Sequence, residues 1–262
     1  MRKLSNITIG SDPECFIIDT RTDQVVSSIG MIPGKKGEPW IHPSFKPGFG
    51  LETDNVLAEF NIPPCKTKAQ FIYSMNFMKD FIISFVKDIN PHYDIKCVAS
   101  LRVPYDQLDH PEAMEIGCMP DYNAYTEAIN PRPEGFQDNL RSAGMHIHLG
   151  CDGGLSFDEI INFVKYFDQY VVLPSLLYDP DTERRSLYGK AGCFRRTPYG
   201  LEARSLSSFM MSNDNLLSIV WDNTMKAIHH FENQTPLIEP ELIQDVINNS
   251  RFDVAKKLIQ TL

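Results

Sequence analysis

The chain has 262 residues, of which 42% are apolar and 23% are charged, a composition typical of globular proteins with a sizeable core. Its formal net charge of −9 argues against nucleic acid or an anionic membrane as its partner. No signal-peptide pattern opens it, and its longest apolar runs are far shorter than the roughly 20 residues of a membrane-spanning helix. We therefore expect a cytoplasmic protein.

The six cysteines are widely scattered and form no Cys-x-x-Cys pair. This pattern argues against a zinc knuckle and predicts reduced, mostly buried thiols. The sequence has no internal repeat, low-complexity tract or Ser/Gly linker, so we predict one domain over residues 1–262.

In the first third of the chain, residues 6–19 predict a strand that passes through a bend, followed by a Gly- and Pro-rich loop over 29–50. Residues 51–62 predict a second strand, which the prolines at 63 and 64 should stop. Thr67 is a suitable N-cap for a helix over 67–89. Its apolar residues recur every three or four positions and should face the core.

The middle of the chain, 90–142, is too polar and Pro-rich for regular core elements. After it, Ser156 and Glu159 form a capping-box pattern at the start of a helix, which Pro174 should kink or end. A basic loop over 181–200 leads to a strand over 201–209. The remaining predicted elements are helices at about 214–232, 239–247 and 251–261. Because strands and helices do not alternate regularly, we predict an α+β fold.

The stretch AGMHIHLG (143–150) alternates apolar and polar residues, as a half-buried strand does. His146 and His148 then share one face, and Met145, Ile147 and Leu149 share the other. The apolar face should point to the core. The side chains of the other predicted strands indicate what the two histidines face.

Three further strands also carry chemically versatile side chains at a spacing of two. Carboxylates suit Mg²⁺ or Mn²⁺, and an arginine suits phosphate. Taken singly, each pattern also fits a solvated strand, a structural histidine pair or a simple turn; together they favour a site. The residues that share such faces are Asp12 and Glu14; Asn55, Glu59 and Asn61; and Glu202 and Arg204.

The basic loop holds 5 of the 25 Lys and Arg residues within thirteen positions. It is either a solvated loop that offsets the acidic surface or a clamp for a polyphosphate. We favour the clamp because the loop leads directly into the Glu202/Arg204 strand. No P-loop or Rossmann motif is present, so a nucleotide would be held in another way. The basic residues are Arg184, Arg185, Lys190, Arg195 and Arg196.

Several motifs resemble the phage-type carboxylate–amine ligase (amidoligase) family, type 2, which is similar to glutamine synthetase and glutamate–cysteine ligase. The resemblance covers about residues 8–212, and its longest motif is the most specific. The motifs are GSDPECF, PGKKGEPW, DNVLAEFNIPP, GCMPDYNAY, RSAGMHIHLG and RRSLYGKAGCFRRTPYGLEARSLSSF.

The resemblance implies a glutamine-synthetase-like antiparallel sheet with a concave active face and helices packed on the other side. ATP and Mg²⁺ or Mn²⁺ would lie against that face. Glu14, Glu59 and Glu202 would be metal ligands, and Asp12 would join them where relatives carry glutamate. Arg204 matches a phosphate-binding arginine. Either His146 or His148 would lie near the nucleotide and metal.

We therefore predict an ATP-dependent ligase that forms an amide bond through an acyl phosphate. Its substrates would be a small-molecule or peptide carboxylate and an amine; the oligomeric state is open. The chain would act in the host cytoplasm if it is phage-encoded. The alternatives are a metal-dependent hydrolase and a non-catalytic protein of the same fold. The predicted catalytic residues are Arg204, His148 and Arg195, and the predicted cofactor-binding residues are Arg184, Arg185, Lys190, Arg196, His146 and Lys36.

Overall fold

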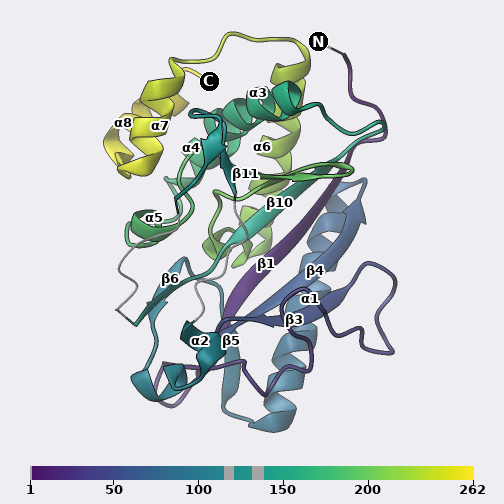
Figure 1. The fold of residues 1–262 in the computed structure, drawn as a ribbon, viewed down its shortest axis with the longest axis vertical. Helices are drawn as coiled ribbons and strands as arrows, with labels where there is room; N and C mark the ends of the chain where they lie inside the picture. The colour runs from purple at the N-terminus through teal and green to yellow at the C-terminus, as the bar shows by residue number, and fades with distance from the viewer. Residues whose placement is uncertain (1, 115–120, 132–138) are drawn as a thin grey trace.

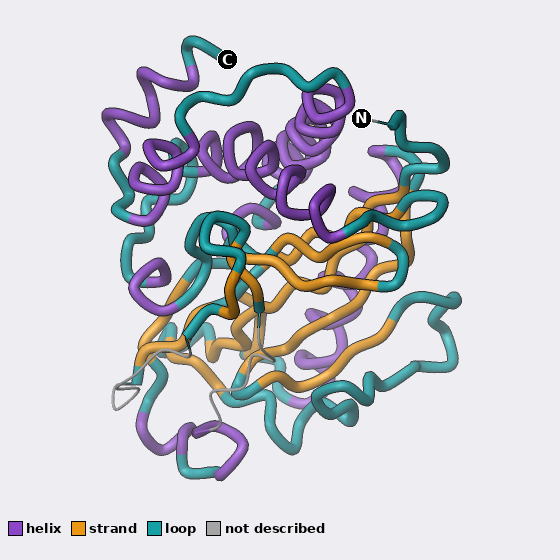
Figure 2. The backbone as a smooth tube through the Cα atoms, turned by 45° about the horizontal axis from the view of Figure 1, so that its top comes forward, coloured by secondary structure: helices purple, strands orange, loops and turns teal. Residues whose placement is uncertain are grey.

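The computed structural model describes residues 2–114, 121–131 and 139–262. A large antiparallel sheet runs diagonally through the molecule, and α1 and α6 lie behind it in the view of Figure 1. Figure 2 shows a large group of helices above the strands, with further helical segments behind and below them. The predicted α+β class, with an antiparallel sheet and helices on its other side, is confirmed.

The main sheet has the strand order β3-β4-β1-β10-β12-β11-β7-β8, and β2 and β5 pair with the second half of β1. β6 and β9 form a separate ladder. The strands are β1 (Thr8–Asp19), β2 (Gln24–Val26), β3 (Gly50–Asp54), β4 (Leu57–Cys65), β5 (Tyr93–Lys96), β6 (Ser100–Arg102), β7 (Tyr122–Asn123), β8 (Ala128–Ile129), β9 (Leu140–Ser142), β10 (Met145–Gly150), β11 (Cys193–Thr197) and β12 (Gly200–Ala203).

The predicted single strand over 51–62 is wrong, because the segment is a hairpin. β3 and β4 are joined by a tight turn in which Asn55 has a φ of +56°. Asn tolerates this left-handed backbone better than most residues, so Asp54-Asn55 is a turn signal. Asn55 therefore lies at the hairpin tip and not on a strand face.

The prolines at 63 and 64 do not stop β4, which continues to Cys65. The ladder between β3 and β4 ends where Gly50 pairs with Asn61. Beyond that pair, no described residue continues the ladder with β4 on the β3 side, and the register of β4 with β1 also shifts between Ile9 and Ser11. Proline is tolerated there because fewer ladder hydrogen bonds need its missing N–H.

The described helices include the three predicted at the C-terminus. They are α1 (Lys68–Ile89), α2 (Pro111–Met114), α3 (Phe157–Phe167), α4 (Leu173–Ser175), α5 (Arg184–Leu187), α6 (Asp214–Glu232), α7 (Pro240–Asn248) and α8 (Phe252–Ile259). Short 3₁₀ turns span Tyr105–Leu108 and Ser208–Met211, and a π-helical turn spans Asp168–Val172.

Local signals for the helix starts are confirmed. The Thr67 hydroxyl accepts a hydrogen bond from the backbone N–H of Gln70 at the start of α1. Ser156 and Glu159 form both hydrogen bonds of a capping box at the start of α3. The helix widens into the π-helical turn just before Pro174 and ends one residue after it.

The basic segment 181–200 was predicted to be a loop. It contains instead the helix α5 and the strand β11. The strand predicted over 201–209 is shorter, since β12 ends at Ala203 and a 3₁₀ turn begins at Ser208. The predicted irregular middle consists, in its described parts, of short strands and turns. The motif GCMPDYNAY lies partly outside the described residues.

The sheet has two chemically different faces. On β10, Met145, Ile147 and Leu149 are at most 1% exposed and belong to the core beneath α1, α3 and α6. Their neighbours His146 and His148 point to the opposite side, which we call the polar face. The predicted alternation of this strand is thus confirmed.

The described cysteines are all free thiols. Among the described residues, none of the helices combines the length and apolar character that crossing a membrane requires.

The core face can be tested by replacing Ile147 with alanine. Because Ile147 is 1% exposed, the Ile147→Ala change should lower the free energy of unfolding by about 2–5 kcal/mol, as is usual for such cavities. Ile41→Ala, at a side chain that is 59% exposed, should change it little. Urea denaturation measures both, and equal losses would contradict the assigned faces.

Candidate active site

Four strands place residues opposite one another in one row across the polar face. Gly10 of β1 lies opposite His148 of β10, His148 lies opposite Glu202 of β12, and Glu202 lies opposite Arg195 of β11. Residues directly opposite one another in an antiparallel ladder point to the same side of the sheet. The register therefore brings residues nearly 200 positions apart into one row.

A second row crosses the polar face on the other side of β1. Glu52 of β3, Glu59 of β4 and Glu14 of β1 lie opposite one another in turn. Asp12, two residues before Glu14, lies opposite His146 and connects the two rows. The predicted metal ligands therefore share one surface of the sheet.

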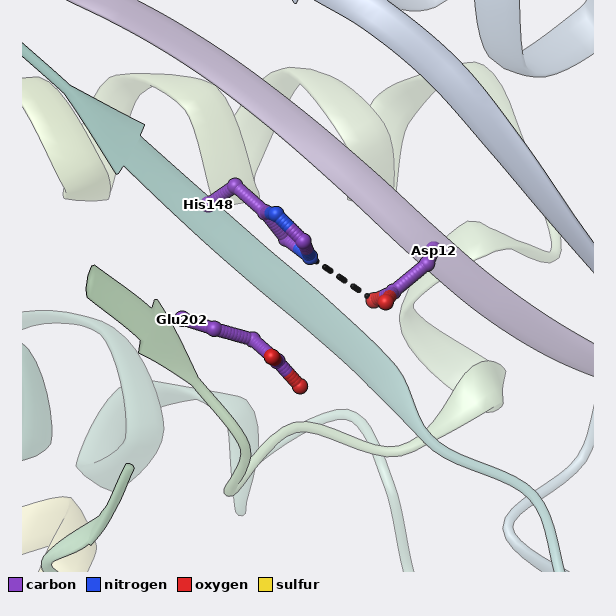
Figure 3. Close-up of side chains that lie close together, drawn as sticks. All are labelled: Asp12, His148 and Glu202. Atoms are coloured by element: carbon purple, nitrogen blue, oxygen red, sulfur yellow. Dashed lines mark ion pairs between the residues drawn. The ribbon is translucent and has the colours of Figure 1, made fainter. Parts of the chain in front are cut away.

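Asp12, His148 and Glu202 form a group that we call the His148 group. Each offers one ligand atom, and these atoms lie within 4.8 Å of one another. Figure 3 shows the three side chains converging, with the His148 Nε2 atom 3.0 Å from Asp12 Oδ1. These two buried atoms face each other and form no hydrogen bond with any side chain outside Asp12 and the two histidines. Buried polar atoms normally have partners, so this geometry leaves room for a further ligand.

His146 approaches the same group from the other end. Its Nδ1 atom lies 3.2 Å from Asp12 Oδ1 and 3.4 Å from Glu202 Oε1. Both histidines thus face Asp12, and His148 is the one whose ring nitrogen belongs to the His148 group.

The charges around Asp12 shift its titration. Burial alone would raise the pKa of Asp12, but His148 and His146 hold it below its ordinary value. Burial would lower the pKa of His148, and the carboxylate of Asp12 raises it instead. Attraction between the Asp12 carboxylate and the histidines therefore stabilises the ionised forms of these side chains.

Glu14, Asp54 and Glu59 form a second group, the Asp54 group, whose ligand atoms also lie within 4.8 Å of one another. Burial and the neighbouring carboxylates raise the pKa of Glu59 well above its ordinary value. Burial also raises the pKa of Glu14, although Glu14 accepts a 2.6 Å hydrogen bond from the backbone N–H of Gly144. These carboxylates repel one another when all are ionised.

Both groups fit divalent cations. The Asp54 group offers only hard oxygen donors, which suit Mg²⁺, and the His148 group adds an imidazole nitrogen, which Mn²⁺ also accepts. A cation would satisfy Asp12 Oδ1 and His148 Nε2 and relieve the repulsion at Glu59.

Two predicted arginines border the His148 group. Arg204 forms an ion pair with Glu202, and its Nη1 lies 3.5 Å from His146 Nδ1. Arg195 Nη1 lies 3.2 Å from the other carboxylate oxygen of Glu202. Glu202 therefore holds both guanidinium groups beside the candidate metal position.

Arg184 reaches the site from α5. It is buried and donates a hydrogen bond to the backbone oxygen of Ser205. A β-carbon at Gly144 would lie 2.8 Å from His146 Nε2 and 3.2 Å from Arg184 Nη2, and one at Gly189 would collide with the same guanidinium. These close approaches explain why the motifs RSAG and YGK have glycine at positions 144 and 189.

The other predicted basic residues lie elsewhere. Arg185 donates to the hydroxyl of Ser250 beside the C-terminal helices. Arg196 follows Arg195 on β11 and so faces the helices, with its guanidinium carbon 5.5 Å from the Phe157 ring centroid. Lys190 is exposed. The fold thus separates the five residues that the sequence placed in one clamp.

Lys36 lies at the edge of the Asp54 group. Its Nζ atom is 2.6 and 2.7 Å from the two carboxylate oxygens of Asp54. The adjacent Gly37 donates its backbone N–H to Glu52. The Gly- and Pro-rich loop therefore touches the polar face at this lysine.

A cavity of about 330 Å³ adjoins the His148 group. The residues that line it include Asn61, Ile62, His148 and Tyr199. A largely apolar cavity with a few polar groups suits a flat organic ligand.

Sequence reasoning missed Asp54, Glu52 and Tyr199. Asp54 and Glu52 share the strand face of Glu59 only if the chain turns at Asn55, and the Asp-Asn pair is the signal that could have shown this. Tyr199 lies within the motif TPYG but outside any alternating pattern. No sequence signal identifies its role.

Strands β10, β11 and β12 lie in a region that matches a known protein family. Residues 136–258 match the family described as Phage phiEco32-like COOH.NH2 ligase-type 2. Over these residues, just under half of the chain, the sequence is similar to the carboxylate–amine ligase family. The resemblance inferred from the motifs is thus confirmed for the part that carries His148, Glu202 and Arg204. No curated protein matches the chain.

The acidic groups of the polar face predict a pH-dependent stability without metal. Burial raises the pKa of Glu52 to about 7, and the pKa values of Glu14, Glu59 and His148 are raised too. A group whose pKa is raised by folding stabilises the fold at low pH, and this contribution is lost as pH rises through the folded-state pKa.

The melting temperature of EDTA-treated protein should therefore fall between pH 5.5 and 8.0. Asp12 titrates below this range and does not oppose the trend. Added Mn²⁺ should raise the melting temperature more at pH 8.0, because its ligands must be deprotonated. Glu59→Gln should flatten the pH dependence and Glu38→Gln, at an exposed loop residue, should not. A rise in the melting temperature of the metal-free protein with pH would contradict this electrostatic description.

Proposed function

We propose that this chain is an ATP-dependent ligase that joins a carboxylate to an amine. The observation that carries the proposal is the contact of Glu202 with His146, Arg195 and Arg204 beside Asp12 and His148. This arrangement combines metal ligands with phosphate-binding cations, and all of its residues except Asp12 lie in the region that the ligase family model matches. Both are needed to transfer a phosphoryl group.

The reaction proceeds in two steps. A carboxylate oxygen of the substrate attacks the γ-phosphorus of ATP, and ADP leaves. The product is an acyl phosphate, a far better electrophile than a carboxylate. The amine then attacks the acyl carbon, loses a proton, and expels inorganic phosphate to give the amide.

Two divalent cations would be held by the His148 group and the Asp54 group, whose donor atoms fit Mg²⁺ or Mn²⁺. When bound, they supply positive charge that neutralises the phosphate oxygens. Asp12 and Glu14, two residues apart on β1, belong to different groups and set their spacing.

The arginines position and stabilise the transferring phosphoryl group. Arg204 and Arg195 are held by Glu202, so little reorganisation is required to present their guanidinium groups to phosphate oxygens. Arg184, fixed behind Gly144, adds positive charge from beneath His146. Arg185 and Arg196 have no part in this clamp.

The nucleotide base would occupy the 330 Å³ cavity beside His148 and Tyr199, with the phosphates extending towards the arginines. The substrates, a small-molecule or peptide carboxylate and an amine, would then enter at the Asp54 group. Lys36, at this edge, is the candidate contact for the substrate carboxylate. The carboxylates around it suit a cationic amine. The hydrolase alternative would use the same metal ligands but leaves the three arginines without a role.

The metal bridge predicts that nucleotide binding depends on divalent cation. Calorimetric titration should detect ATP binding with Mg²⁺ and strongly weakened binding with EDTA. Glu202→Gln should weaken binding with Mg²⁺, because it removes a ligand charge and loosens two arginines. Equal ATP affinity with Mg²⁺ and with EDTA would refute the bridge.

The reaction class is tested by trapping the activated acid. With ATP, Mg²⁺, hydroxylamine and a panel of carboxylates, the protein should form a hydroxamate and release one ADP for each. AMP formed with the hydroxamate would overturn the acyl phosphate, and ADP without any hydroxamate would indicate simple ATP hydrolysis.

Arg204→Lys should slow the same reaction by about a hundredfold or more, because a point charge cannot reproduce a bidentate contact. Arg196→Lys is the matched control, since Arg196 lies on the helix-covered face of the same sheet. An unimpaired Arg204→Lys protein would remove this residue from the mechanism. Chromatography of the nucleotides provides the rate for each variant.

A further inference from the structure

Tyr199 occupies the tight turn that joins β11 to β12. Thr197 and Gly200 pair across this turn. The backbone oxygen of Tyr199 accepts a 3.1 Å hydrogen bond from the N–H of Cys151, which follows β10. The turn is therefore fixed against the end of the histidine strand, and the ring of Tyr199 is held beside His148.

The side chain of Tyr199 meets one specific atom of His148. The hydroxyl oxygen lies 2.6 Å from Nδ1, and the two ring planes are inclined by 19°. The other ring nitrogen, Nε2, points to Asp12 and Glu202 (Figure 3). The two nitrogens of this imidazole thus have separate partners.

We propose that Tyr199 is a positioning residue whose hydroxyl oxygen accepts the Nδ1 proton of His148, leaving the Nε2 lone pair available to a divalent metal. This inference rests on the proposed function, which places a metal in the His148 group. An imidazole that binds metal through one nitrogen ordinarily donates from the other, and its partner fixes both the tautomer and the ring orientation.

The opposite arrangement is incompatible with metal binding. If Tyr199 donated its proton to Nδ1, the neutral ring would carry its hydrogen on Nε2. That hydrogen would point at Asp12, where a metal would have to bind. Only the tautomer protonated at Nδ1 combines a hydrogen bond to Tyr199 with a free lone pair facing Asp12 and Glu202.

A merely structural role is distinguishable, because Tyr199 is 46% exposed. Removing its hydroxyl leaves the ring, the turn and the backbone hydrogen bond to Cys151 in place. The Tyr199→Phe protein should therefore melt within a degree or two of the unmodified protein. Its altered property should be metal binding.

The test is Mn²⁺ binding to the metal-free protein, followed by electron paramagnetic resonance. The unmodified chain should bind two Mn²⁺ ions, one in each group. Tyr199→Phe should weaken one of them by about 10–100-fold, the usual effect of losing such a partner, and leave the other unchanged. Tyr105→Phe, at a side chain that is 70% exposed, is the control and should alter neither.

The ¹⁵N spectrum of His148 with Mg²⁺ bound gives a second readout. The unmodified protein should show the proton on Nδ1, and Tyr199→Phe should show a mixture of tautomers. Two Mn²⁺ ions bound with unaltered affinity by Tyr199→Phe would overturn the role of Tyr199 and leave the proposed function standing. Failure of the unmodified protein to bind Mn²⁺ would overturn the metal sites of the proposed function and this role with them.

Discussion

Repulsion among carboxylates on one face of a sheet is the constraint on which the rest of the structure depends. Asp12, Glu14, Glu59 and Glu202 are each less than a tenth exposed; they lie on the neighbouring strands β4 and β1 and on β12, which β10 separates from β1. Water cannot screen them fully, so the protein surrounds them with fixed cations. A carboxylate cluster without such partners would take up protons and lose its affinity for metal.

The distribution of positive charge follows from this constraint. Guanidinium groups and imidazoles occupy the side of β1 on which β10, β12 and β11 lie. On the β3 and β4 side, Lys36 forms an ion pair with Asp54. The pKa of Asp12, near the histidines, is lowered, whereas those of Glu14, Glu52 and Glu59 are raised. One face therefore contains a compensated half and an acidic half, which is the polarity that a phosphate donor and a cationic amine require.

Much of the site could be predicted because strand alternation is a local property. Residues such as Asp12, Glu14, His148 and Glu202 lie on the same side of their strands whatever the order of the strands. The pairing of those strands is not local, so no spacing rule could predict that Glu202 contacts Arg195 and His146. The family resemblance implied only that metal and phosphate ligands share one active face, and the registers agree with that.

The errors have equally local causes. The hairpin at Asn55 was missed because a two-residue turn interrupts an apolar pattern only briefly, and Asp54 was lost with it. The predicted clamp grouped Arg195 with Arg196 because both were counted as loop residues. On β11 they alternate, and one of them faces the helices.

Because β1 lies at the centre of the sheet, both candidate metal groups depend on the register of this one strand. This strand pairs with β4 on one side and β10 on the other, and it supplies Asp12 to one group and Glu14 to the other. A slip of one residue along it would turn both carboxylates into the core and bring Pro13 to the polar face. Such a change would remove both groups together, so stepwise loss of one centre must proceed by substitution rather than by insertion or deletion. Changes in chain length are therefore expected to accumulate in the connecting segments, and the length of this strand should stay fixed as the family diversifies.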